Sequence, residues 1–235
     1  MKKKVISILI MICMLFTLVP APAMAATTVK LGNISLPNGY CLVTNEDTTT
    51  KSGDNGGNYV AYYNNNVLTL NGLNINNGKL NITQSLGATF TIKLADGSQN
   101  TVITAGEGAV SAIGTNYGTI DIIGNGTLYA IGQHNGIWTY NGLNIGSSSD
   151  NPTVVAQGGE YNGIATYRNG DVVLKNGNVT AIGINKFGIA GDKKNNHKIG
   201  DITVKDSSKM MARSISKALE KPAEDASGNE VGTTT

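Results

Sequence analysis

Short runs of alternating apolar and polar residues recur along most of the chain. The runs are 4–6 residues long and rich in β-branched residues, which favours strands over helices. Ten Asn-Gly steps lie within or between them, and both residues of such a step tolerate a positive φ, so each step is typical of a turn. Helical spacing is absent before about Ser208. The pattern predicts an all-β protein.

The runs also recur in a fixed order, with a period of about 26 residues. One series comprises 101–105, 127–131, 153–157 and 178–182; a second comprises 89–92, 119–122, 142–145, 171–174 and 201–204; another comprises 109–113, 136–140, 163–167 and 188–192. An antiparallel sandwich also contains many short strands. Three strand positions that repeat in the same order instead indicate a stacked solenoid. We therefore expect a parallel β-helix, capped at both ends.

Strand parity predicts which side chains fill the interior, because successive side chains point to opposite faces. In the middle series we expect stacked inner pairs such as Ile120 and Ile122 over Leu143 and Ile145. The other two series predict the inner columns Val110, Ile137, Ile164 and Ile189, and Val102, Leu128, Val154 and Val179. Each member of the last column is followed two residues later by a small residue: Thr104, Ala130, Ala156 or Ala181.

The chain divides into five segments by composition and period. We expect a signal peptide at 1–25, an N-terminal cap with irregular strands at 26–66, the β-helix at 67–206, a C-terminal cap at 207–221 and a flexible tail at 222–235. Within the C-terminal cap, the stretch from Ser208 to Leu219 fits either a short helix or a last degenerate coil.

The first 25 residues have the composition of a secretory signal. Three lysines precede a short apolar stretch, and Ala23-Met24-Ala25 matches a cleavage site. We expect a secreted protein that leaves the membrane after cleavage. The cleaved chain would hold 15 basic and 16 acidic side chains (18 − 3 against 16), which argues against nucleic-acid binding. Cys41 would then be the single cysteine, so no intramolecular disulfide is expected.

The charged residues do not form a pattern typical of catalysis or metal binding. Asp121 stands alone in its column, and Asp171 and Asp201 align only at strand starts, where acids also serve turns. The paired carboxylates of a hydrolase and the calcium-binding acids of a lyase are therefore not evident. His134 and His197 lack partners at ligand spacing. We expect no catalytic residues, no metal and no cofactor.

The aromatic residues are the strongest binding candidates. Parity places Trp138 and Tyr140 on the outer face, with Trp138 in a column with Ser111, Ala165 and Ala190, and Tyr140 beside Ile113 and Tyr167. Tyr161 and His134, on the loops before the same strands, would lie at the rim. An exposed aromatic patch of this kind is typical of a binding surface, and sugars stack on such rings. The alternative is that a terminal loop covers this face.

The segment from Asn66 to Ile75, followed by the Gly-Ile and Asn-Gly-x-Val-Thr-Ala-Ile-Gly coils, resembles a family of secreted right-handed β-helix repeat proteins of Gram-positive bacteria. Members are often described as carbohydrate-binding, and the family has no catalytic residues to transfer. The resemblance implies the fold more than the function. Together, the signal peptide, the repeats and the columns of Trp138, Tyr140 and Tyr167 favour a non-catalytic protein that binds polysaccharide or cell-wall glycan. Two alternatives are a structural or adhesive spacer and, because pectate-lyase-like folds are β-helices, a polysaccharide lyase or hydrolase.

Overall fold

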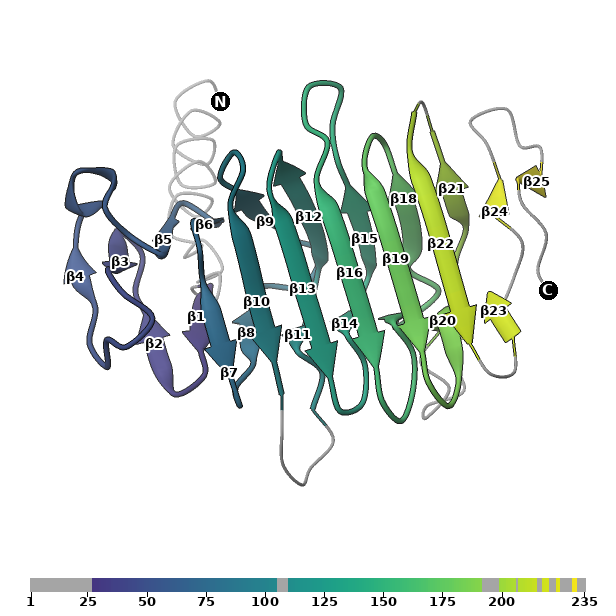
Figure 1. The fold of residues 1–235 in the computed structure, drawn as a ribbon, viewed down its shortest axis with the longest axis horizontal. Coiled ribbons are helices and arrows are strands. Elements are labelled where there is room, and N and C mark those ends of the chain that lie inside the picture. Colours follow the sequence, from purple (N-terminus) through teal and green to yellow (C-terminus); the bar gives the residue numbers. More distant parts are fainter. Residues whose placement is uncertain are drawn as a thin grey trace, which may run out of the picture.

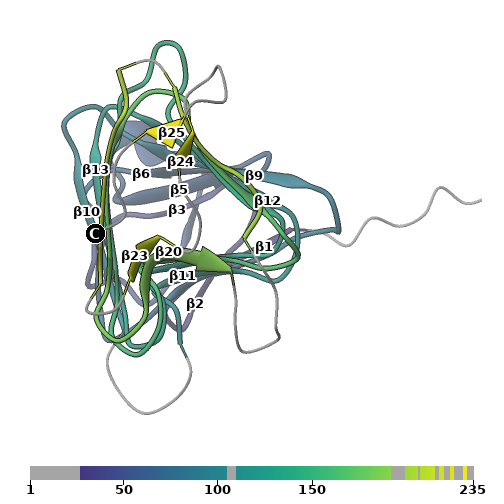
Figure 2. The ribbon, with the colours of Figure 1, turned by 90° about the vertical axis from the view of Figure 1, so that its right-hand side faces the viewer.

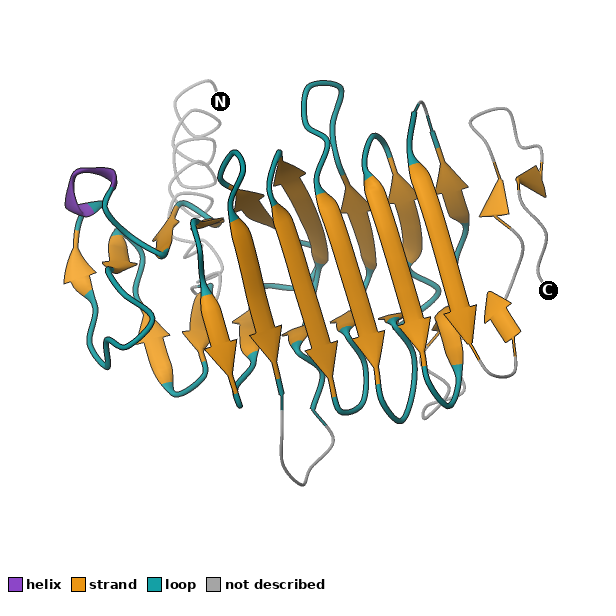
Figure 3. Cartoon of the chain, viewed as in Figure 1, coloured by secondary structure: helices purple, strands orange, loops and turns teal. Residues whose placement is uncertain are grey.

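The structure is a computed structural model that describes residues 27–104, 110–191, 199–205, 207–214, 217–219, 223–224 and 230–231. The predicted signal peptide, residues 192–198 and most of the predicted tail lie outside the described residues. Strands dominate the described part, and its one helical element is a short 3₁₀ turn, η1, at Asn55–Gly57 (Figure 3).

The strands form three sheets that wrap around one core, so the chain is a parallel β-helix, as the repeat predicts. Viewed along the stacking axis, successive coils superpose as a triangle (Figure 2). About five turns of roughly 27 residues follow one another along the long axis (Figure 1). The hydrogen bonds between coils are those of parallel ladders, which leave only the ends of each sheet unpaired.

We name the sheets A, B and C. Sheet A runs in the order β2 (Ile34–Leu36), β1 (Thr28–Leu31), β8 (Leu80–Thr83), β11 (Ile113–Thr115), β14 (Ile137–Thr139), β17 (Ile164–Thr166), β20 (Phe187–Gly191) and β23 (Lys217–Leu219). Sheet C runs in the order β22 (Lys209–Ser214), β19 (Asn178–Gly183), β16 (Thr153–Gly158), β13 (Thr127–Gly132), β10 (Gln99–Ile103) and β7 (Asn74–Asn76).

Sheet B is the longest of the three. It runs in the order β25 (Glu230–Val231), β24 (Ala223–Glu224), β21 (Ile202–Val204), β18 (Asp171–Leu174), β15 (Gly142–Ile145), β12 (Thr119–Gly124), β9 (Thr89–Leu94), β6 (Val67–Leu70), β5 (Ala61–Asn64), β3 (Tyr40–Leu42) and β4 (Lys51–Ser52). The N-terminal strands pair antiparallel, β1 with β2 and β8 in sheet A and β3, β4, β5 and β6 in sheet B. They cover the first coil on those two sides.

At the other end, the stretch from Ser208 continues the solenoid as strand. β22 pairs in parallel with β19, and β23 with β20. Of the two alternatives for this stretch, the degenerate coil is therefore the one observed. The inner positions of β22 are only partly buried, as expected for a last coil.

The predicted register is right for sheet B and wrong at one strand in each of the other sheets. In sheet B, Ile120 pairs with Leu143, and Ile122 with Ile145. In sheet C, Leu128 aligns with Asn100 rather than with Val102, which pairs with Ala130. A shift of two residues preserves the inner face, so Val102 is still buried.

In sheet A, the residue that pairs with Ile137 is Ile113, not Val110. Val110 lies just outside the strand and is only partly buried, whereas Ile113 is fully buried. The physical reason is that β11 and β14 are separated by a shorter coil than β14 and β17, so a fixed period counted back from Ile137 places the strand three residues too early.

The core is apolar apart from a few enclosed polar side chains. Isoleucine, leucine and valine columns fill all three inner faces. The fully buried polar residues are Asn100 in sheet C and Thr115, Thr139 and Thr166 in sheet A. Asn100 makes several hydrogen bonds, whereas the hydroxyls of Thr139 and Thr166 have no hydrogen-bond partner among the described residues.

Cys41 is fully buried on β3, and burial raises the pKa of its thiol. Because the thiolate is the reactive form, we expect a chain beginning at residue 26 to react very slowly with Ellman's reagent. In urea the same chain should release the equivalent of its single thiol, with free cysteine in the same buffers as the control. Complete reaction of the folded protein within minutes would contradict the burial.

Candidate binding site

The five residues predicted to bind lie on one side of the solenoid, along the outer face of sheet A. Trp138 projects outward from the middle of β14, between the inward Ile137 and Thr139. Tyr140 and Tyr167 directly follow β14 and β17, whose residues pair one to one. His134 and Tyr161 lie in the turns that precede these two strands. All five side chains are partly buried.

The outward tyrosines form a continuous aromatic cluster with Trp138. The ring centroids of Tyr140 and Tyr167 are 4.9 Å apart, and those of Trp138 and Tyr167 are 6.1 Å apart. Tyr117 packs edge-on against Tyr140 at 5.1 Å. The Arg168 guanidinium carbon lies 5.2 Å from the centroid of the Tyr140 ring, at cation–π distance. We call Tyr117, Trp138, Tyr140 and Tyr167 the aromatic cluster.

His134 and Tyr161 form a second group one coil apart. Their rings are 4.7 Å apart, and His134 Nε2 lies 2.8 Å from a Glu160 carboxylate oxygen. The corner beneath them is held by stacked amides: the Asn135 side chain accepts a hydrogen bond from the Asn162 backbone N–H at 3.1 Å. The Asn162 side chain repeats the bond to the Phe187 N–H in the next coil. Such repetition holds this corner rigidly.

A cleft of about 270 Å³ lies where these two groups meet. Trp138, Tyr161 and His134 contribute its rings, and Asn81, Asn116 and Asn135 contribute side-chain amides. Gly114 lines the cleft next to Trp138, with which it pairs across the strands. A Cβ added at Gly114 would meet no atom within 4 Å, so the missing side chain leaves open space there. Tyr140 and Tyr167 do not line the cleft but adjoin it through the Tyr167–Trp138 contact.

Two predicted neighbours in this region are wrong. The residue beside Trp138 is Gly114 rather than Ser111, and Ile113 points into the core instead of lying beside Tyr140. Both errors follow from the shifted register of β11. Ala165 and Ala190 do align with Trp138 as expected, but both are almost completely buried. The outer face is therefore open on the Gly114 side of Trp138 and closed on the other side.

Several residues of this region were not expected from the sequence. Tyr117 belongs to the cluster because it lies just past β11, and the correct register of that strand would have located it. Glu160 and Arg168 are turn residues whose partners come from the preceding coil. A larger hollow of about 610 Å³ lies beside β7 at the N-terminal end of the solenoid. The sequence repeat did not predict this hollow, because it lies where the repeat stops.

The acidic residues considered as catalytic candidates make structural hydrogen bonds. Asn144 Nδ2 donates to Asp121 Oδ1 at 2.7 Å. The Asp171 carboxylate accepts the backbone N–H of Asp201 at 2.7 Å. Within the described ranges, no group of three or more His, Cys, Asp or Glu residues is placed to hold a metal ion. The same part of the chain contains no helix long and apolar enough to cross a membrane.

No family model, no curated protein and no solved structure matches this chain significantly.

Proposed function

We propose that this protein is a secreted, non-catalytic binding protein that recognises a carbohydrate chain, such as a polysaccharide or cell-wall glycan, on the outer face of sheet A. The observation that carries the proposal is the cleft beside Trp138, where aromatic rings and side-chain amides converge on open space above Gly114. The proposed secretion rests on the sequence of residues 1–25, and the proposed kinship with Gram-positive β-helix proteins rests on the repeat motifs.

The chemistry of the cleft suits a sugar. Pyranose rings present flat C–H faces that pack on aromatic rings, and Trp138 and Tyr161 supply two such surfaces. Their hydroxyl groups need both donors and acceptors, and an asparagine amide provides both. Asn81, Asn116 and Asn135 bring these amides from three successive coils. A ligand in the cleft would therefore be hydrogen-bonded at several points along the stacking axis of the coils.

The adjoining aromatic cluster extends this surface beyond the cleft. Tyr167 touches Trp138, and Tyr140 and Tyr117 continue the row of rings toward the turn that holds Arg168. A row of rings longer than one sugar favours a polymer over a monosaccharide. The Tyr117 side chain is 43% exposed, so the far end of the row is open to solvent.

Retention on cell-wall polysaccharides, measured by pull-down and by glycan array, tests the proposal. Trp138→Ala removes a stacking surface, and Gly114→Leu places a side chain in the cleft at a position where the Cβ meets no atom within 4 Å. Each should weaken retention by about tenfold, the effect of losing roughly 1.4 kcal/mol. The matched control is Tyr129→Ala, which removes a 36% exposed ring from the outer face of sheet C and should leave retention unchanged.

Unchanged retention of both cleft variants would exclude this site. Absence of retention for every glycan tested would favour a structural spacer instead. Release of unsaturated sugars from pectin-type substrates in the presence of calcium would show a lyase and contradict the non-catalytic proposal.

A further inference from the structure

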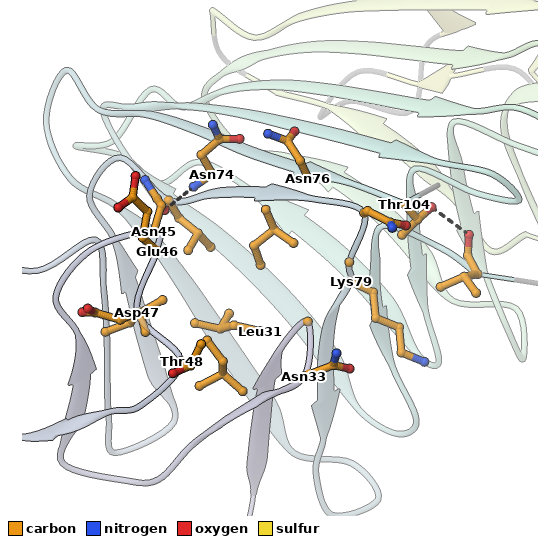
Figure 4. A pocket seen from close by; sticks show the side chains of 18 of the residues that line it. Leu31, Asn33, Asn45, Glu46, Asp47, Thr48, Asn74, Asn76, Lys79 and Thr104 are labelled. Carbon is orange, nitrogen blue, oxygen red and sulfur yellow. Dashed lines mark hydrogen bonds between the residues drawn. The ribbon is translucent and has the colours of Figure 1, made fainter. Parts of the chain in front are cut away.

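Sheet C ends one or more strands earlier than its two neighbours at the N-terminal end of the solenoid. Beyond β8, sheet A continues with β1 and β2, and beyond β6, sheet B continues with β5, β3 and β4. Sheet C stops at β7, and no described strand pairs with the outer edge of β7. The space beside β7 is the hollow of about 610 Å³ (Figure 4).

The backbone of β7 presents hydrogen-bonding groups to this space. The Leu73 carbonyl accepts from Thr101 N in β10 at 2.7 Å, so residues 73 and 75 direct their backbone groups toward β10. The groups of Asn74 and Asn76 consequently point outward. The Asn74 N–H bonds to the Asn45 side chain, whereas the Asn74 carbonyl and the Asn76 N–H have no partner among the described residues.

Asn45 shows how this edge is satisfied. Its side chain accepts from Asn74 N at 2.7 Å (Figure 4) and donates to the Gly72 carbonyl at 3.0 Å. In a parallel ladder, one residue bonds to the residues before and after the one beside it. The Asn45 amide therefore takes the place of one residue of a parallel strand at the level of Leu73. A strand that continued past Asn45 would next bond to β7 through the residue beside Ile75. That residue would donate its N–H to the Asn74 carbonyl and accept the Asn76 N–H.

The hollow has an apolar floor and charges of opposite sign at its two ends. Leu31, Leu42 and Leu73 are buried beneath it, and the partly buried Ile75 of β7 lines it. Glu46 and Asp47 lie at the end where β7 begins, and Lys79 lies beyond the end of β7 (Figure 4). A parallel strand would thus have its first residues near the two carboxylates and its last residues near the ammonium group.

We propose that β7 accepts an extended peptide segment of a partner protein as an added parallel strand. The segment has a basic residue near its start, apolar side chains at alternate positions and an acidic residue near its end. Its backbone bonds to Asn74 and Asn76, and its apolar side chains enter the hollow beside Ile75. Strand addition of this kind takes its affinity from main-chain bonds and its specificity from the pockets for alternate side chains.

The occupant is a free segment rather than the end of a second solenoid. Strands β1 to β5 extend past β7 on the two flanking sheets, and β24 and β25 extend past β22 at the opposite end. The two ends would collide before β22 of one copy reached β7 of another. The proposal does not rest on the carbohydrate site, because the hollow lies beside β7 of sheet C and the cleft lies on sheet A, although Lys79 and Val110 line both.

Fluorescence anisotropy with a labelled hexapeptide, Lys-Thr-Val-Thr-Val-Glu, tests the proposal. We expect saturable binding with a Kd below about 1 mM. Asn76→Pro removes the outward N–H but no bond to β10, and proline is tolerated at a sheet edge. It should weaken binding about tenfold relative to Asn76→Ala, which keeps the N–H and is the matched control. The reversed sequence Glu-Val-Thr-Val-Thr-Lys should bind several-fold more weakly than the hexapeptide.

Three further outcomes complete the test. A hexapeptide N-methylated at each valine should lose binding to the unmodified protein, which checks the backbone bonds even if Asn76→Pro fails to fold. Trp138→Ala should bind the hexapeptide as the parent protein does. Equal binding to the Pro and Ala variants, equal binding of the reversed peptide, or no saturable binding would overturn the proposal. Self-association that Asn76→Pro abolishes would identify a second copy as the occupant and would also overturn it.

Discussion

Asn100→Leu is expected to lower the free energy of unfolding by about 4 kcal/mol, although leucine matches the apolar column in which Asn100 stands. The Asn100 side chain is fully buried and uses both ends of its amide. Its oxygen accepts from the backbone N–H groups of Gly72 at 2.9 Å and Leu73 at 3.0 Å. Its nitrogen donates to Ser98 Oγ at 2.8 Å and to the Thr127 carbonyl at 3.2 Å.

The cost arises from the groups that leucine leaves behind. A buried donor without a partner costs about 1–3 kcal/mol, and the N–H groups of Gly72 and Leu73 would both lose their acceptor. The gain from a larger apolar side chain offsets part of this. Urea denaturation followed by circular dichroism measures the difference. A variant as stable as the parent would show that these bonds contribute nothing net.

Thr139→Val is the matched control with the opposite expectation. Thr139 is as fully buried as Asn100, but its hydroxyl has no hydrogen-bond partner among the described residues. Valine has nearly the same shape and removes a polar group that the fold does not use. We expect stability to be unchanged or to rise by about 1 kcal/mol. Together the two variants compare a buried polar side chain that is hydrogen-bonded with a buried polar side chain that is not.

Asn100 also explains where inference from the sequence fails. The inner column of sheet C was recognised by its large apolar residues, Leu128, Val154 and Val179, and a polar residue at that level was not expected. The predicted alignment therefore placed Val102, two residues later in the chain, beside Leu128. The error left the faces unchanged because strand parity is conserved by an even shift. Period and parity predict the architecture and the interior, but not the register at a coil that breaks the pattern.

The sequence predicted only part of the candidate site, because period and parity locate residues on regularly spaced strands but not at the coil that breaks the pattern. Trp138, Tyr140 and Tyr167 follow from parity and from the regular spacing between β14 and β17. The cleft itself does not, because its open floor is Gly114, which belongs to the strand whose register was shifted. The hollow beside β7 lies where the repeat ends, and the Asn45 contacts that mark it span 27 and 29 residues of an irregular cap. Long-range contacts of this kind carry no local pattern.

Gly158→Ala is expected to destabilise the protein by about 3 kcal/mol, a large effect for one added methyl group. Gly132, Gly158 and Gly183 form a column at the ends of neighbouring strands in sheet C. A Cβ on Gly158 would overlap the Asn162 carbonyl oxygen and lie 2.5 Å from the His134 carbonyl oxygen. Glycine is required here by the close approach of the returning chain. Gly114→Ala is the control, since its Cβ meets no atom within 4 Å and should change stability little.

The expected cost is high because the corner cannot relax locally. The Gly159 and Glu160 N–H groups donate to the carbonyls of Gly132 and Gln133 in the coil below, at 3.0 and 2.7 Å. Backbone displaced at Gly158 would stretch these bonds and carry Tyr161 away from His134, with which it walls the cleft. Thermal unfolding of the two variants measures the difference. If Gly158→Ala unfolds at the same temperature as Gly114→Ala, the chain around Gly158 is loosely packed. The stacked glycines then do not position Tyr161 and His134.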